Sequence, residues 1–429
     1  MILKKEEIML KKIGLVILSL IFTLLFFYGC ERWPTAPPDI IPPVASLTAP
    51  ADSAVVKDTV LITVSATDNS GVVSRVDFYI DNQLLFTDNS SPFSFNWPTL
   101  IYQDSSYHNI LAIAYDAAGN FDSTQTITVL VVLDTGLLFI GQAATPTSAY
   151  SVFVSGNYAY VAEQGNGVQI FNVSNPANPT AVGLFDTPGS TNGVFKSGNY
   201  LYLADGNNGL QVLNVSDPAN PTFTGQNIPP GYAQEVFVSG NYAYVAATGD
   251  GMYIINVIDP ANPTFVSRFA LATSDSGVQV VNNTAYVSDG ANGLRIIDVT
   301  NPASPVQIGS YATAGDIYFR SFILGNYAYV AAKGSGIFII DVTNPAIPSQ
   351  AGSYSLALGS AKGIYVNGTV AYVANGDEGL LVLDVAVPSS ISQLASFKTA
   401  GNAHNNVFYS NGFIYVASNS GLLVFRYNP

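Results

Sequence analysis

Gly156-Asn157-Tyr158-Ala159-Tyr160-Val161-Ala162 is one copy of a phrase that recurs along the C-terminal two thirds of this 429-residue chain. The second tyrosine of the phrase has counterparts 42 or 43 residues apart, at Tyr160, Tyr202, Tyr244, Tyr286, Tyr329, Tyr372 and Tyr415. The glycine that opens the next apolar run keeps the same spacing, at Gly167, Gly209, Gly251, Gly293, Gly336, Gly379 and Gly421. Two independent marks in one register indicate seven structural repeats.

Each copy reads as four short strands, which we name A to D in chain order. In the first copy we expect strands at Ser151 to Ser155, Tyr158 to Glu163, Val168 to Val173 and Thr180 to Phe185. Side chains of two kinds alternate along strand B, which is typical of a β-strand. Prolines follow strand C, and prolines commonly end strands. Four strands in about 42 residues match one blade of a β-propeller, whose radial closure protects the strand edges. The predicted fold class is therefore all-β, with a seven-bladed propeller.

The ends of the repeat array indicate how the ring closes. The seventh copy reaches Asn428-Pro429 without a strand D. Upstream of the first copy, Leu138 to Gln142 matches the strand D segment Thr180 to Leu184, and Gly141 lies 42 residues before the equivalent glycine. We therefore predict that residues 134–429 form a propeller closed by an N-terminal strand, which completes the seventh blade.

The repeats resemble the LVIVD family of bacterial and archaeal surface proteins. The resemblance is plainest in Gly293-Leu294-Arg295-Ile296-Ile297-Asp298-Val299-Thr300-Asn301-Pro302, and Gly209 to Pro221 and Gly336 to Pro348 match nearly as well. The sixth copy departs from the phrase, with Ala386-Val387-Pro388 in place of Thr-Asn-Pro. The resemblance implies a β-propeller and no defined activity.

The N-terminal residues predict export and attachment to a membrane. Lys11 and Lys12 precede an apolar run from Ile13 to Phe27, and the only cysteine of the chain, Cys30, follows Gly29. This arrangement resembles a bacterial lipobox, so we expect residues 1–29 to be a lipoprotein signal peptide and Cys30 to carry lipid. A transmembrane anchor is the alternative, although 15 apolar residues fall short of the roughly 20 that span a bilayer. The expected location is the bacterial cell envelope, at the outer membrane or cell surface.

A linker and a small domain lie between this anchor and the propeller. Residues 30–43 hold five prolines, a composition that favours an extended stalk. Residues 44–133 alternate apolar and polar side chains between turns, as in Val76-Asp77-Phe78-Tyr79-Ile80-Asp81. They resemble bacterial Ig-like domains in that segment and in Tyr115-Asp116-Ala117-Ala118-Gly119-Asn120. We predict an N-terminal Ig-like β-sandwich without a disulfide, which serves as a spacer.

Composition excludes several classes of function. The chain has 15 basic and 29 acidic residues and a net charge of −14, with no basic stripe, so we expect no nucleic-acid partner. Its two histidines cannot form a zinc-protease helix, and no phosphate-binding loop or nucleophile elbow is present. We therefore expect no cofactor and no enzyme activity.

Acidic residues recur in the hairpins between strands B and C, on one face of the predicted ring. They are Glu163, Asp205, Asp250, Asp289, Asp377 and Glu378. Oxygen-rich loops suit calcium, but tight hairpins also require Asp-Gly and Asn-Gly sequences, and the ligand spacing of an EF-hand is missing. We interpret these residues as turn residues and keep calcium as the alternative.

The repeats differ from one another where strand D leads to the next strand A, at the mouth of the central channel. Side chains at a ligand site on a pseudo-symmetric ring must break the symmetry, although drift of unconstrained loops would give the same scatter. The candidate ligand-binding residues are Tyr150, Asn192, Gln234, Glu235, Arg320, Lys362 and His404. We expect Arg320, Lys362 and His404 to form a cationic cluster for an anionic ligand group, such as a uronate or an acidic peptide.

The interpretation that best fits these features is a surface-anchored, non-enzymatic lipoprotein whose propeller binds a protein or glycan at one face. Two alternatives remain open. One is a glycan lyase or hydrolase with Glu235 or Asp275 as acid or base, and with Arg320 and Lys362 holding the sugar. The other is a structural component of the envelope or surface layer.

Overall fold

A computed structural model describes residues 38–57, 59–99, 106–132, 136–271, 277–398 and 403–428. Every regular element in these residues is a β-strand. The first of two compact units ends at Leu130, and the second begins at Val131 and also takes in Pro98–Ser106. No helix in the described part of the chain could span a membrane. The predicted signal peptide, Cys30 and most of the linker lie outside the described residues.

The first unit is a sandwich of two sheets, as predicted. One sheet has the order β1-β3-β6, and the other has the order β2-β9-β7-β4-β5 with β8 paired to β7. The strands are β1 (Val44–Ala49), β2 (Val55–Val56), β3 (Thr59–Thr67), β4 (Val73–Ile80), β5 (Gln83–Asp88), β6 (Ser94–Pro98), β7 (Ser106–Asp116), β8 (Phe121–Ser123) and β9 (Ile127–Val131). Alternate side chains point inward, and Ile62, Phe78 and Trp97 are completely buried between the sheets.

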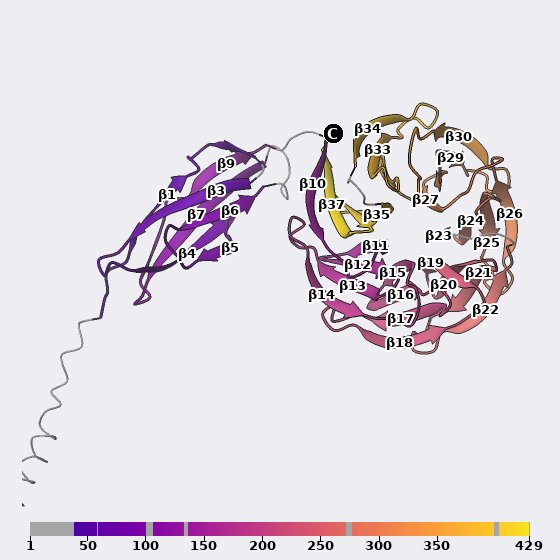
Figure 1. Cartoon of the computed structure of the whole chain (residues 1–429), viewed down its shortest axis with the longest axis horizontal. Helices are drawn as coiled ribbons and strands as arrows, with labels where there is room; N and C mark the ends of the chain where they lie inside the picture. Colours follow the sequence, from indigo (N-terminus) through magenta and orange to yellow (C-terminus); the bar gives the residue numbers. More distant parts are fainter. Residues whose placement is uncertain are drawn as a thin grey trace, which may run out of the picture. The chain divides into compact units, whose positions relative to one another are not determined.

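The second unit is a ring of seven four-stranded antiparallel sheets, which we number as blades 1 to 7 (Figure 1). Blade 1 is β11 (Ala149–Ser155), β12 (Tyr158–Glu163), β13 (Gly167–Asn172) and β14 (Thr180–Phe185). Blade 2 is β15 (Gly193–Ser197), β16 (Tyr200–Ala204), β17 (Leu210–Asn214) and β18 (Thr222–Asn227). Blade 3 is β19 (Tyr232–Ser239), β20 (Tyr242–Thr248), β21 (Gly251–Asn256) and β22 (Thr264–Phe269). Strands B and D of the first copy have the predicted bounds.

Blade 4 is β23 (Gly277–Val281), β24 (Thr284–Ser288), β25 (Leu294–Asp298) and β26 (Val306–Tyr311). Blade 5 is β27 (Arg320–Leu324), β28 (Tyr327–Ala332), β29 (Gly336–Asp341) and β30 (Ser349–Tyr354). Blade 6 is β31 (Gly363–Asn367), β32 (Val370–Ala374), β33 (Leu380–Asp384) and β34 (Ser392–Phe397). Blade 7 is β35 (His404–Ser410), β36 (Phe413–Ser418) and β37 (Gly421–Asn428), with β10 (Gly136–Ala143) as its outer strand.

The predicted closing strand is confirmed. Strand β10 pairs antiparallel with β37, so that Leu138 lies opposite Arg426 and Gln142 lies opposite Leu423. The innermost strands contact their neighbours all around the ring, including β35 against β11 (Figure 1). The outer edge of the last sheet is therefore paired by a segment almost 300 residues earlier in the chain.

The repeat tyrosines pack at the junctions between neighbouring blades. All seven are at most 6% exposed, and each packs into the apolar cluster that its blade shares with the following blade. Tyr160, for example, packs with Val194, Leu201 and Leu213 of blade 2. The tyrosine thus recurs because every junction needs the same packing, and ligand-specific features must be sought at positions that do not repeat.

Candidate functional site

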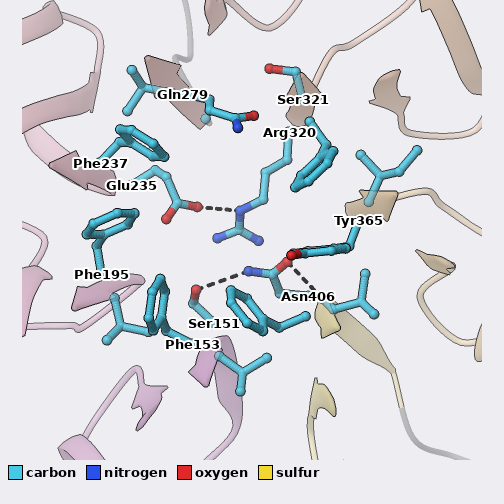
Figure 2. A pocket seen from close by; sticks show the side chains of 18 of the residues that line it. Ser151, Phe153, Phe195, Glu235, Phe237, Gln279, Arg320, Ser321, Tyr365 and Asn406 are labelled. Atoms are coloured by element: carbon cyan, nitrogen blue, oxygen red, sulfur yellow. Dashed lines mark hydrogen bonds and ion pairs between the residues drawn. The ribbon is translucent and has the colours of Figure 1, made fainter. Parts of the chain in front are cut away.

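The innermost strands surround a cavity of about 140 Å³ in the central channel, seen from close by in Figure 2. Two layers of side chains line it, because every second residue of each innermost strand points toward the ring centre. The first layer is polar and lies toward the predicted mouth. The second layer, two residues further along each strand, is mostly aromatic.

Around much of the ring, glycines alternate with large polar residues in the polar layer. Its seven equivalent positions are Ser151, Gly193, Glu235, Gly277, Arg320, Gly363 and Asn406. A Cβ at Gly193, Gly277 or Gly363 would approach atoms of the residue at the next position, to 2.8 Å at Glu235, 3.1 Å at Arg320 and 2.7 Å at Asn406. The glycines therefore make room for three large polar side chains, a pattern that blade packing alone does not require.

An ion pair crosses the polar layer. Nε of Arg320, from blade 5, lies 2.5 Å from Oε2 of Glu235, from blade 3, and the two side chains are only 11% and 12% exposed (Figure 2). Nη1 of Arg320 also donates to the carbonyl oxygen of Asn405 at 3.4 Å, and its Cζ lies 5.9 Å from the ring centre of Tyr150. Burial raises the pKa of Glu235, and the charge of Arg320 opposes that shift. Arg320 thus connects blades 1, 3, 5 and 7.

A belt of aromatic side chains forms the second layer, and our sequence analysis missed it. The signal was present, because the residue seven positions before the repeat tyrosine is aromatic in every copy except the fourth, which has Gln279. The members are Phe153, Phe195, Phe237, Phe322, Tyr365 and Phe408. Five consecutive pairs of rings connect Phe237 to Phe322 through the belt, and the ring centres of each pair are 4.4 to 5.1 Å from each other. Gln279 closes the gap, and its Oε1 accepts from the backbone N–H of Ile323 at 2.8 Å.

The structure places three more candidate residues near the cavity. Tyr150 is half-buried beside Arg320. Gln234 is half-buried and does not line the cavity. Its backbone carbonyl oxygen packs against Gly193. Nζ of Lys362 donates to Oδ1 of Asn405 at 2.9 Å, and burial lowers the pKa of Lys362. Lys362 also borders a pocket with Ser360 and Asp377.

Two candidates hold blades together instead of facing the mouth. His404 is completely buried, where its backbone exchanges hydrogen bonds of 2.9 and 3.2 Å with Gly376 of the preceding blade. Burial lowers the pKa of His404 to about 4, so its ring is neutral near pH 7. Asn192 is also buried, and its Nδ2 donates to the carbonyl oxygen of Ala233 in the next blade.

The expected cluster of three cations is therefore wrong. His404 carries no charge near pH 7, and the guanidinium of Arg320 is paired with Glu235. The sequence placed these residues correctly at one end of the strands, but the burial of His404 at a blade junction was missed.

Two of the acidic hairpin residues accept hydrogen bonds from neighbouring loops. Oδ1 of the buried Asp205 accepts from the hydroxyls of Thr187 and Thr191 at 2.6 and 2.8 Å, and its Oδ2 accepts from the N–H of Gly189. Oε2 of Glu163 accepts from the N–H and hydroxyl of Thr147. These bonds supply a structural reason for the acid at these two positions.

Carboxylates close enough together to share a cation occur elsewhere in the described part of the chain. Asp39, Asp68 and Asp116 of the first unit have oxygens within 4.8 Å of one another. Each also accepts hydrogen bonds from protein groups, including those of Asn69, Ser70 and Asn120.

Comparison with protein families agrees with this architecture. Residues 43–129 match the bacterial Ig domain. The LVIVD repeat matches residues 146–187, 188–227, 230–270, 274–313, 322–355 and 358–399, which together are more than half of the chain. The chain belongs to the LVIVD-repeat family. The six matches cover blades 1 to 6, and the seventh blade is evident from the structure.

Solved structures share the fold of this LVIVD-repeat protein. The computationally designed Ika8 protein aligns with a TM-score of 0.53 at 6% identity, over 76% of this chain and 94% of that one. The Cps50 (Swd1) β-propeller domain of Myceliophteria thermophila aligns with a TM-score of 0.53 at 12% identity, over 66% of this chain and 99% of that one. A search of curated proteins finds no match. An Ig domain joined to an LVIVD propeller suggests a surface or structural protein.

Proposed function

We propose that this protein is a non-enzymatic lipoprotein of the bacterial cell envelope, anchored through Cys30, whose propeller binds a protein or glycan at the mouth of its channel. The observation that carries the proposal is the asymmetric polar layer. Seven equivalent positions hold a carboxylate, a guanidinium, an amide, a hydroxyl and three glycines that accommodate them. Such a non-repeating set on a repeating scaffold is what recognition of one ligand requires.

The cavity lining favours binding over catalysis. Glu235 is the one carboxylate among the described residues that line it, and its Oε2 is held by Arg320. Glycosidases commonly need two carboxyl groups on either side of one bond. Asp275, the second candidate acid, lies outside the described residues. A cavity of about 140 Å³ has room for several waters or for one small group of a larger ligand.

The test is binding of the full-length protein, purified in detergent, to a glycan array and to proteins extracted from the cell surface. The informative variant combines Tyr150→Ala and Lys362→Ala, because both side chains are half-buried at the mouth and neither joins the Glu235–Arg320 pair. Lys398→Ala is the matched control, since it removes a lysine that pairs with Glu378 in the same blade. We expect at least tenfold weaker binding for the double variant and no change for the control.

Other outcomes would overturn the proposal. Cleavage of an arrayed glycan that Glu235→Gln abolishes would identify an enzyme. Equal binding by wild type and the double variant would exclude the mouth as the site. Binding abolished only by changes on the outer strands of the blades would favour a structural role in the envelope.

A further inference from the structure

Two of the seven junctions between blades lack the aromatic residue that packs into the other five: strand D ends in Asn227 in blade 2, and in Ala143 of β10 in blade 7. At five junctions the last residue of strand D is aromatic and packs against the apolar cluster shared with the next blade. These residues are Phe185, Phe269, Tyr311, Tyr354 and Phe397. Blade 2 has Asn227 at this position, and its Nδ2 donates to the carbonyl oxygen of Pro263 in blade 3. At the junction of blades 2 and 3, no aromatic side chain from the end of the outer strand β18 fills the space between the two blades.

A groove of about 460 Å³ lies where the aromatic side chain is absent, and this volume is within the usual range of small-molecule sites. One wall is the loop of Ile228, Pro229 and Pro230, and the other is formed by Tyr253 and Phe265 of blade 3. The two aromatic rings pack edge to face at 64°, with centres 6.1 Å apart. Phe265 is 55% exposed, so its ring is available for stacking.

Two buried polar atoms beside the groove have no hydrogen-bond partner among the described residues. One is the hydroxyl of Tyr253, whose side chain is 2% exposed and lines the groove. The other is Oδ2 of Asp250, whose Oδ1 pairs with Arg268, a further lining residue. A buried polar group without a partner is destabilising, so a ligand that supplies the partner gains affinity.

We propose that this groove binds a neutral sugar residue of a glycan. A pyranose ring offers an apolar C–H face for Phe265 and hydroxyls on its rim. A hydroxyl both donates and accepts, so a sugar hydroxyl satisfies the phenol of Tyr253, which lines the groove; Asp250 does not line it and is connected to it through its partner Arg268. A charged sugar gains nothing, because the guanidinium of Arg268 is already neutralised by Asp250.

A proline-rich peptide is the rival occupant, since such peptides dock in aromatic-lined grooves. Its prolines carry no N–H groups, so it offers fewer donors than a sugar for the phenol oxygen of Tyr253. The groove shares no lining residue with the channel cavity, and the inference goes beyond the function proposed for the mouth.

The experiment uses the full-length protein in a detergent without a sugar head group. It is applied to arrayed neutral and uronate-bearing oligosaccharides, and the neutral hits are measured by titration calorimetry. Phe265→Ala removes the stacking surface, and Tyr253→Phe removes one hydroxyl while keeping the ring. Phe223→Ala is the matched control, because Phe223 has the equivalent position in blade 2, is 51% exposed and lines no part of the groove.

We expect neutral oligosaccharides to bind, with at least a tenfold loss for Phe265→Ala, a several-fold loss for Tyr253→Phe and no change for Phe223→Ala. The Tyr150→Ala and Lys362→Ala double variant must bind these sugars normally, which separates this site from the mouth. No binding of neutral sugars, equal losses in the control, or capture only of proline-rich peptides would overturn the proposal.

Discussion

Gly277 of blade 4 provides the space in which Arg320 of blade 5 extends toward Glu235 of blade 3. A Cβ at position 277 would lie 3.2 Å from Cγ of Arg320 and 2.9 Å from the carbonyl oxygen of Phe319. The glycine and the ion pair are therefore one structural feature, although these residues come from three different repeats. Their relationship leads to the first two predictions.

Removing the charge of Arg320 should destabilise the ring. Arg320→Met keeps much of the side-chain volume but leaves Glu235 buried without its counter-charge. We expect a loss of about 2 to 3 kcal/mol in the free energy of unfolding, somewhat less than for fully buried pairs. Chemical denaturation measures it, and adding Glu235→Gln should restore most of the loss. A stability equal to that of wild type would show that the pair is merely a surface contact.

Arg320 is not an exposed loop residue, for which a change to alanine would alter stability little. The side chain is nearly buried and touches three other blades, so a loss of ligand binding in an Arg320 variant would not by itself locate the site.

A side chain at position 277 should displace Arg320. Gly277→Ala is expected to cost about 1 to 3 kcal/mol, as overpacking of a filled interior does. Gly334→Ala is the control, because a Cβ at Gly334 would meet no atom within 4 Å. Thermal unfolding of the two variants compares them directly. Equal unfolding temperatures for Gly277→Ala and the control would show that the polar layer accommodates a methyl group without strain, and would contradict the prediction.

His404 should make the propeller sensitive to acid. Its pKa is lowered to about 4 in the folded state from an ordinary value of 6.5, so folding favours the neutral ring. The stabilisation is complete above pH 6.5 and is lost as the pH falls toward 4, by about 3 kcal/mol in total. His404→Asn should flatten the stability profile of the propeller across this range. An unchanged slope in the variant would assign the acid sensitivity to other groups.

The proposed membrane anchor depends on one residue. If Cys30 carries the lipid, Cys30→Ala should abolish lipid attachment and cleavage by the lipoprotein signal peptidase, because the proposed acceptor thiol is removed. Metabolic labelling with a fatty-acid probe, followed by gel analysis, measures both effects. Equal labelling of the variant and wild type would rule out the lipoprotein.

The sequence predicted those parts of the fold that repeat. Strand Thr180–Phe185 has the predicted bounds, and the closing strand could be located because Gly141 keeps the 42-residue spacing to Gly183. Both inferences depend on period and alternation, which follow directly from strand geometry.

The candidate site was only partly predictable. Glu235 and Arg320 could be placed at the mouth, but their pairing joins residues 85 positions apart and depends on the spacing between blades 3 and 5. His404 has the position of a backbone bridge that recurs between blades, as in Ala233 with Gly206 and Ala361 with Lys333. The alanines at these equivalent positions are buried and were the available signal that His404 is buried too. The aromatic belt was predictable, because Phe153 and its counterparts keep the spacing of the repeat and alternate with the polar layer along each innermost strand.

The most direct test of the proposed function is hydrogen exchange of the full-length protein with and without a ligand found by the array or the pull-down. The account predicts that protection gathers where the innermost strands begin, around Tyr150 in β11, Gln234 in β19 and Lys362 before β31. Protection confined to the outer strands of the blades, with no change at these segments, would contradict binding at the mouth.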